Sequence, residues 1–145
     1  MSLDSDLYKT YLLRIRRGNY KGIISNAKPL YVLTLLNLIE KDKINNNIII
    51  FDENLNIAYK RMNMIYMRNE TKLTPLSYPY YHLANDGFYF LQWKGMRIKN
   101  DTPSPKFLKT HVSYAYLDEP LWELLQNAEV RKEYREAIEK HYFGK

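Results

Sequence analysis

The feature that most constrains the fold is a stretch beginning at Pro29 that is apolar on almost every side when drawn as a helix. Seven aliphatic residues fall within the ten positions after this proline, interrupted mainly by Thr34 and Asn37. A helix that is hydrophobic all round must be covered by other elements, and proline suits the first position of a helix. We therefore predict a central buried helix from Pro29 to about Asp42, with Lys28 at its mouth and outside it.

A chain of 145 residues is expected to form one domain, residues 1–145, because it can bury about two thirds of its unfolded surface. Residues 1–5 are expected to be disordered or cloning-derived. Other helical patterns surround the central helix, each with apolar residues recurring at i and i+4. They cover Asp6–Arg17, with Ser5 as its N-cap, then Asp52–Arg68, capped by Asp52, with Leu55, Ala58, Met62 and Ile65 on one face, and finally Ala128–Tyr142.

The β-structure predicted by the sequence is limited. Ile48–Phe51 is a short β-prone run. Phe88–Trp93 reads as a buried strand, and a turn at Lys94-Gly95 leads to a possible return strand over Met96–Lys99, which together predict a β-hairpin. Val112–Leu117 is of undecided type. The chain is thus predicted to be α+β and mainly helical, with a winged-helix-like core, a small β-hairpin and C-terminal helices.

Aromatic residues and a proline crowd together in the segment Tyr78-Pro79-Tyr80-Tyr81-His82. One interpretation is ordinary core, because aromatic side chains bury large areas. The other is a recognition surface. A proline ring fixes the backbone, and Tyr and His offer flat faces with one polar tip each, so the segment could form a shallow, rigid pocket.

Basic residues are concentrated in the larger part of the chain. Residues 1–117 hold seventeen Lys and Arg against nine Asp and Glu, whereas residues 118–145 hold five against seven, giving net charges of +8 and −2. Cations that neutralise phosphates release condensed counterions, so this distribution is typical of a protein that binds a polyanion.

Three groups of cations are candidate DNA contacts. The arginines at the end of the first predicted helix either complement the helix dipole or lie along a phosphate backbone. Lys60 lies on the face of Asp52–Arg68 opposite Leu55, a face that is either a groove reader or simply solvated. A second cluster follows the predicted hairpin. These candidates are Arg14, Arg16 and Arg17; Lys60; and Arg97, Lys99, Lys106 and Lys109.

Several classes of site are not supported by the sequence. The chain has no cysteine, which excludes disulfides, thiolate metal sites and cysteine nucleophiles. The three histidines show no local metal-ligand spacing, and no glycine-rich phosphate loop or nucleophile elbow occurs. We therefore predict no metal, no cofactor and no catalysis by this chain. Without a secretory signal or a bilayer-length apolar run, a cytoplasmic location and no membrane partner are expected.

An ordered set of motifs resembles a known family over roughly residues 20–143. The chain is similar to the DNA sulfur-binding domain that precedes the HNH nuclease domain in modification-dependent restriction endonucleases. The motifs are Lys28-Pro29-Leu30, Ile44 through Phe51-Asp52-Glu53, Tyr78 through Leu83 with Asn85-Asp86-Gly87-Phe88, Tyr116 through Glu119 with Leu121 through Leu125, and His141-Tyr142-Phe143.

The resemblance implies a reader of phosphorothioate DNA in bacterial restriction-modification and defence. In such DNA, one non-bridging phosphate oxygen is replaced by sulfur. The HNH nuclease domain that would cleave the DNA has no motif in this chain, which would be a fragment or a stand-alone reader. The implied partners are double-stranded DNA and an HNH nuclease domain or a second copy of the chain.

The pocket implied by the resemblance is apolar and flanked by one cation. Sulfur is larger than oxygen and accepts hydrogen bonds poorly, so aromatic and proline faces suit it, while the diester charge needs a basic partner. The implied residues are Lys28, Pro29, Tyr78, Pro79, Tyr80, Tyr81 and His82. Family members often have His-Arg where this chain has Ala27-Lys28, a difference that bears on sulfur selectivity more than on DNA binding.

Two functions of different classes follow from these features. The first is a non-catalytic module that binds modified DNA. The alternative is a protein-interaction or oligomerisation module whose exposed tyrosines contact a partner protein.

Overall fold

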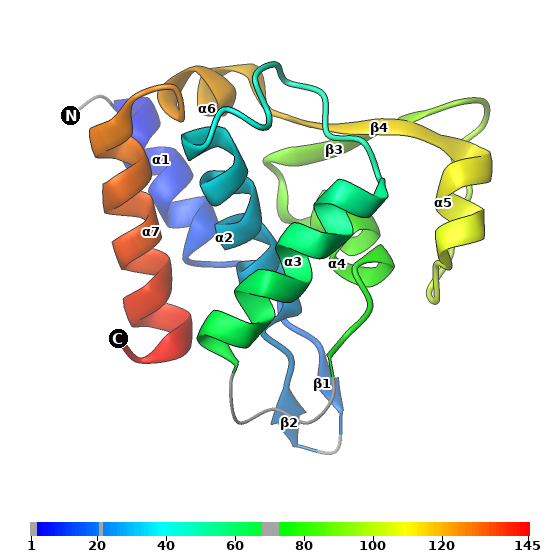
Figure 1. The fold of residues 1–145 in the computed structure, drawn as a ribbon, viewed down its shortest axis with the longest axis horizontal. Helices are drawn as coiled ribbons and strands as arrows, with labels where there is room; N and C mark the ends of the chain where they lie inside the picture. The colour runs from blue at the N-terminus through cyan, green and yellow to red at the C-terminus, as the bar shows by residue number, and fades with distance from the viewer. Residues whose placement is uncertain (1–2, 21, 68–72) are drawn as a thin grey trace.

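The computed structural model describes residues 3–20, 22–67 and 73–145 (Figure 1). These residues form an α+β fold that is mainly helical, as the sequence predicts. Two small antiparallel sheets accompany the helices. In chain order the elements are α1 (Leu3–Leu12), β1 (Asn19–Tyr20), β2 (Ile23–Ile24), α2 (Ala27–Glu40), α3 (Glu53–Tyr66), α4 (Ser77–His82), the 3-10 helix η1 (Leu83–Asp86), β3 (Tyr89–Trp93), α5 (Pro105–His111), β4 (Val112–Leu117), α6 (Glu119–Leu124) and α7 (Ala128–Phe143).

Helix α2 is the centre of the fold, which confirms the prediction of a buried helix. It packs against α3, α4 and α7 (Figure 1), and its residues from Pro29 to Leu36 are all buried. The helix begins two residues earlier than expected, at Ala27, so Lys28 lies in its first turn and not outside it. It ends at Glu40, before Asp42 adopts a left-handed backbone with φ of 58°.

Helix α3 begins as predicted and differs at its end. The Asp52 carboxylate accepts a hydrogen bond from the Leu55 amide at 2.9 Å, which caps the helix. Leu55, Ala58 and Met62 are buried, but Ile65 is 48% exposed. Tyr66 occupies the inward position instead: its ring lies 5.3 Å from that of Phe143 on α7, so the last turn presents Tyr66 to the core.

The antiparallel pair of β3 and β4 replaces the predicted hairpin. Tyr89 pairs with Leu117, and the ladder runs to Trp93 opposite Val112, with an irregularity at Gln92 and Trp93. The expected return strand over 96–99 is wrong: those residues are exposed and belong to no strand. Val112–Leu117 takes this place beside β3, because the side chains of Val112, Ala115 and Leu117 are buried in the core.

The N-terminal and C-terminal helices are tied together by tyrosine hydroxyls. Tyr134 donates to the Ser5 carbonyl at 2.8 Å, and Tyr142 donates to the Leu12 carbonyl at 2.6 Å. Ser5 is therefore an interior residue of α1, not an N-cap, and residues 3–5 belong to the fold. Because α1 ends at Leu12, the predicted helix over 6–17 is too long at its C-terminal end.

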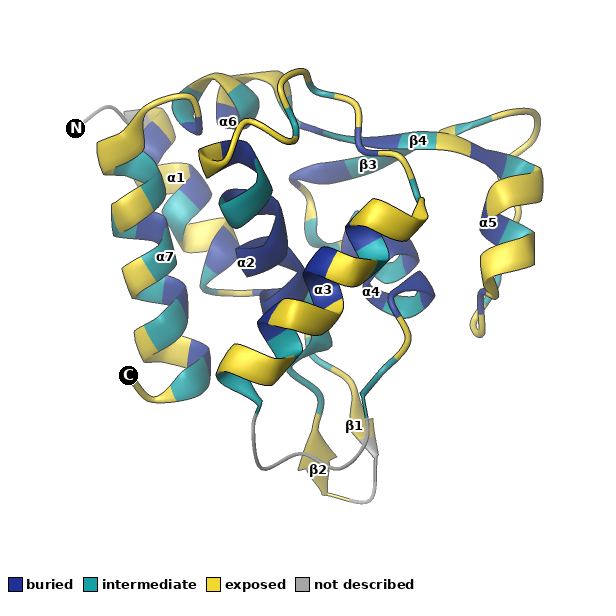
Figure 2. Ribbon diagram, in the orientation of Figure 1, coloured by how far each residue is buried: buried dark blue, intermediate teal, exposed yellow. Residues whose placement is uncertain are grey.

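The buried residues form one core around α2, and the pair of β3 and β4 extends from it together with α5 (Figure 2). Residues 94–111, which connect β3 to β4 and include α5, are called the basic arm below. All of residues 94–99 are exposed. The arm therefore projects beyond the helical body and offers a surface of its own (Figure 1).

Candidate nucleic-acid interface

The aromatic segment folds as helix α4 followed directly by η1, and the two together are called the α4–η1 segment below. The chain ends this segment at Gly87, whose φ of 90° lies in the left-handed region that glycine adopts without strain. The turn leads at once into β3. One face of the segment meets the core, its middle contacts the basic arm, and its C-terminal end contacts the residues after α1.

The inward face of α4 is ordinary core, which corrects part of the predicted pocket. Tyr80 is fully buried, and its hydroxyl donates to the Ile49 carbonyl at 2.8 Å. Tyr89 donates to the Tyr80 carbonyl at 2.7 Å, and its hydroxyl lies 2.9 Å from that of Tyr31. Burial raises the pKa of Tyr31, Tyr80 and Tyr89. These rings hold the fold together and cannot line a surface pocket.

Pro79 and Pro29 are buried as well. Their rings are packed inside the protein, so the prediction that they line an open niche is wrong for the conformation described. Tyr81 is nearly buried, with 9% of its surface exposed. The burial of Tyr80 and Tyr81 counts against the protein-interaction alternative, in which exposed tyrosines contact a partner.

The outward face of α4 carries Tyr78 and His82, the two members of the aromatic segment that remain partly exposed. They are four residues apart, and their ring centroids lie 6.1 Å apart in an edge-to-face arrangement. A helix places side chains at i and i+4 on one face. This pair is the part of the segment that a ligand can reach.

Tyr81 and His82 fasten the basic arm to α4. The Tyr81 hydroxyl donates to the Ile98 carbonyl at 3.1 Å and accepts from the Asn100 amide at 2.9 Å. His82 Nε2 lies 3.2 Å from the Asp101 carbonyl. One side of the aromatic segment thus positions the start of the arm.

The basic arm gathers the second predicted cluster of cations on one projecting element. It contains five Lys or Arg residues against the single carboxylate of Asp101, a net charge of +4. The arm is closed by α5, whose N-cap Ser104 accepts a hydrogen bond from the Phe107 amide at 3.0 Å. Its predicted contact residues Arg97, Lys99, Lys106 and Lys109 are all exposed.

The C-terminal end of the segment binds the residues that follow α1. Lys28 Nζ lies 2.8 Å from Asp86 Oδ2, and the Arg16 amide donates to Asp86 Oδ1 at 2.9 Å. The Arg16 guanidinium donates to the Asn85 carbonyl at 3.1 Å. Asp86 therefore holds Lys28 and Arg16 next to each other at the end of η1.

The remaining two arginines of the first cluster differ in their surroundings. Arg17 donates to Asn26 Oδ1 at 2.9 Å, and its guanidinium lies 5.0 Å from the centre of the Tyr142 ring. Arg14 is exposed. Both follow α1, so the predicted location in the last turn of that helix is wrong and neither complements its dipole.

The charge of Lys28 is already balanced, whereas those of the other candidates are not. Among the described residues, three salt bridges occur, and Lys28–Asp86 is the one that includes a predicted contact residue. The positive charges on the exposed cations of the arm and on the arginines after α1 are not neutralised by any of these salt bridges. Lys60 lies on the exposed face of α3, and no hydrogen bond or ion pair of the described residues connects it to the α4–η1 segment.

Asp86 and Asn85 are the important residues that sequence reasoning missed. Both lie in the motif Asn85-Asp86-Gly87, between the aromatic segment and β3. In sequence this motif indicates a turn, because Asn, Asp and Gly are the residues that turns favour. The sequence did not indicate which cation would pair with Asp86.

Two further observations limit the chemistry of the described residues. They contain no group of three or more His, Cys, Asp or Glu side chains that could hold a metal ion. None of their helices combines the length and apolar character needed to cross a bilayer.

No protein-family model matches the sequence, and no curated protein matches it.

Proposed function

We propose that this chain is a non-catalytic module that binds double-stranded DNA and is selective for a modified, phosphorothioate linkage. The observation that supports the proposal is that one segment, α4–η1, contacts the basic arm, Lys28 and Arg16 of the first predicted cluster. Tyr81 and His82 hold the arm, and Asp86 with Asn85 holds Lys28 and Arg16. Cations fixed by a common scaffold can follow a phosphate backbone in register.

A winged-helix-like arrangement belongs to the same proposal. Helices α2 and α3 pack against each other, and Ile49 in the loop between them forms a β-bridge with Ala115 of β4. In this interpretation β3, β4 and the basic arm take the place of the wing. The four predicted contact residues of the arm, Arg97, Lys99, Lys106 and Lys109, then contact phosphates, while the exposed face of α3, with Lys60, is the groove reader.

Selectivity for sulfur is assigned to the accessible edge of the aromatic segment. Tyr78 and His82 offer partly exposed ring faces near the arm, and such faces suit a large, weakly hydrated sulfur atom better than a hydrated oxygen. Lys28 supplies the positive charge, since its side chain remains 14% exposed beside Asp86. Because that charge is shared with Asp86, the gain from sulfur is expected to be smaller than with an unpaired arginine.

The experiment is a fluorescence-polarisation titration of matched duplexes with and without one phosphorothioate, each measured over a series of salt concentrations. Binding to both duplexes with a steep loss of affinity in salt supports DNA binding, because counterion release gives a slope of about 0.9 per phosphate contact. Tighter binding to the sulfur duplex supports phosphorothioate reading. Equal affinity for the two duplexes would contradict phosphorothioate recognition. The absence of salt-dependent binding to either duplex would contradict DNA binding.

The proposal includes an HNH nuclease domain as a partner of this chain. The present chain would supply recognition, and cleavage would depend on that domain. Incubating the pure chain with supercoiled DNA and Mg²⁺ checks this division. Nicking activity that co-purifies with the protein would show instead that the chain is itself a nuclease.

A further inference from the structure

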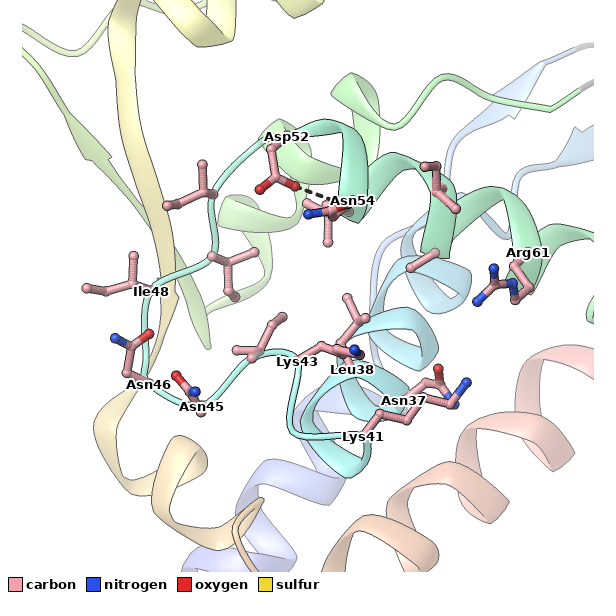
Figure 3. Close-up of a pocket in the computed structure, with 16 residues that line it drawn as sticks. Asn37, Leu38, Lys41, Lys43, Asn45, Asn46, Ile48, Asp52, Asn54 and Arg61 are labelled. Atoms are coloured by element: carbon pink, nitrogen blue, oxygen red, sulfur yellow. Dashed lines mark hydrogen bonds between the residues drawn. The ribbon is translucent and has the colours of Figure 1, made fainter.

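A pocket of about 640 Å³ lies at the C-terminal end of α2, the end opposite Lys28. It is bounded by the C-terminal end of α2, by residues 41–52 and by the N-terminal half of α3 (Figure 3). The Lys28 site is at the other end of α2, which is fourteen residues long and therefore spans about 20 Å. The volume falls within the range of small-molecule sites, about 300–1,000 Å³.

The floor and rim of the pocket are aliphatic. Ile49 and Leu55 are buried beneath it, while Ile48, Ile50 and Ile57 on its rim are 41%, 54% and 46% exposed. Three isoleucines exposed around one concavity leave apolar surface in water, which is unfavourable unless a ligand covers it. The apolar surface is suited to the flat face of a ring.

The pocket also carries an excess of positive charge. Lys41, Lys43 and Arg61 line it against one carboxylate, that of Asp52. Asp52 is engaged in capping α3 through the Leu55 amide. Among the described residues, no salt bridge involves any of the three cations. Figure 3 shows Arg61 on α3 facing the end of α2 that bears Lys41. An anionic group is the complement of this arrangement.

Four asparagine amides complete the lining: Asn37, Asn45, Asn46 and Asn54. Within the part of the chain that is described, none of these four side chains makes a hydrogen bond to protein, whereas neighbouring Asn47 bonds to both the amide and the carbonyl of Leu117. Each free amide presents two donors and one acceptor. They can pair with a ligand whose edge carries both donors and acceptors.

We propose that this pocket binds a nucleotide. The ring face rests on the aliphatic floor, the base edge pairs with asparagine amides, and the phosphate is bound by Lys43 and Arg61. A fatty-acid anion would satisfy the aliphatic floor and the cations but would cover the asparagine amides without pairing them, which is unfavourable. Inorganic phosphate alone would leave the isoleucines uncovered. The proposal is independent of DNA binding at the α4–η1 segment.

The test is an NMR titration of the full chain with AMP, GMP, CMP and UMP, and with adenosine, inorganic phosphate and octanoate as comparison ligands. We expect the Arg61 side chain and the asparagine side-chain amides of the pocket to shift with at least one nucleotide at millimolar concentration. The double variant Lys43→Gln with Arg61→Gln should weaken that binding about tenfold or more, since a charge-assisted hydrogen bond contributes about 1.5–3 kcal/mol.

The double variant Lys132→Gln with Lys140→Gln is the matched control, because both lysines are exposed on α7, neither lines the pocket, and the change removes the same two charges. It should leave the affinity unchanged, and circular dichroism should show all variants folded. Tighter binding of octanoate than of every nucleotide would overturn the proposal. So would shifts confined to residues outside the pocket, an affinity unchanged in the double variant, or no saturable shift with any nucleotide.

Discussion

Lys28 Nζ lies 2.8 Å from Asp86 Oδ2, and the Asp86 side chain is only 2% exposed while that of Lys28 is 14% exposed. This pair connects the first turn of the central helix to the end of the α4–η1 segment. The Arg16 amide donates to the second oxygen of the same carboxylate. A single shielded carboxylate therefore positions two residues of the proposed interface.

Asp86→Asn should lower the free energy of unfolding by about 2–3 kcal/mol, since it leaves the Lys28 ammonium poorly solvated and unpaired. Lys28→Met combined with Asp86→Asn should cost less than the two single changes added together. Urea denaturation of the four proteins measures this coupling. Lys9→Met is the control, because the Lys9–Glu133 pair is 37% and 28% exposed and should contribute less than about 1 kcal/mol. Additive effects at Lys28 and Asp86 would contradict the pairing.

Tyr81→Phe should loosen the start of the basic arm. The change removes one hydroxyl that joins the Ile98 carbonyl to the Asn100 amide, and a lost hydrogen bond of this kind costs about 1 kcal/mol. Hydrogen exchange of the Asn100 amide should accelerate while amides of α2 stay protected. Tyr114→Phe on β4 serves as control. Unchanged exchange at Asn100 would show that the arm is held by other contacts.

Removing charge from the arm should weaken DNA binding uniformly. Lys106→Gln with Lys109→Gln is expected to reduce the slope of log affinity against log salt by about 2, one unit for each lost phosphate contact. The same loss should appear with and without phosphorothioate, because phosphate contacts position the DNA. Lys132→Gln with Lys140→Gln on α7 changes the net charge equally and should leave the slope nearly unaltered. Equal effects of the two double variants would mean that only net charge matters.

Alkaline pH should unfold the protein through its buried tyrosines. Burial raises the pKa of Tyr31, Tyr80 and Tyr89 in the folded state above the ordinary value of 10.0, and it raises that of Tyr66 to about 12. Above pH 10 the unfolded chain releases these protons while the native state keeps them. Stability is therefore fully present below pH 10 and falls as pH rises, by about 1.4 kcal/mol per pH unit for each retained proton.

Absorbance at 295 nm and circular dichroism, followed together from neutral pH upward, measure this effect. The buried tyrosines should ionise only as the helical signal disappears. Ionisation of all tyrosines near pH 10 in a still folded protein would contradict the burial described. Tyr89→Phe provides a comparison, since one fewer proton is then retained in the core.

Local chemistry made several elements predictable. The apolar sequence after Pro29 required a covered helix, and the Asp52 carboxylate cap followed from its position before Leu55. These features depend on neighbours three or four residues away, so composition and spacing contain the needed information. The limits of α1 were less predictable, because Ser5 is a favourable N-cap in isolation and is overridden by the hydrogen bond that its carbonyl accepts from Tyr134.

The sequence by itself determined that the chain is mainly helical, that its core is rich in tyrosine and aliphatic residues, and that its excess of cations over carboxylates lies in residues 1–117. Only the tertiary structure decided which aromatic faces are covered and which cations are paired. Tyr80 became core while Tyr78 remained accessible, because α4 presents one face to α2 and β3. Lys28 pairs with Asp86, and β3 pairs with β4. In each case the two partners are far apart in the chain, and the sequence pattern does not specify which residues will pair. Such long-range pairing depends on how the whole chain packs, so it cannot be predicted from the neighbouring residues in the sequence alone.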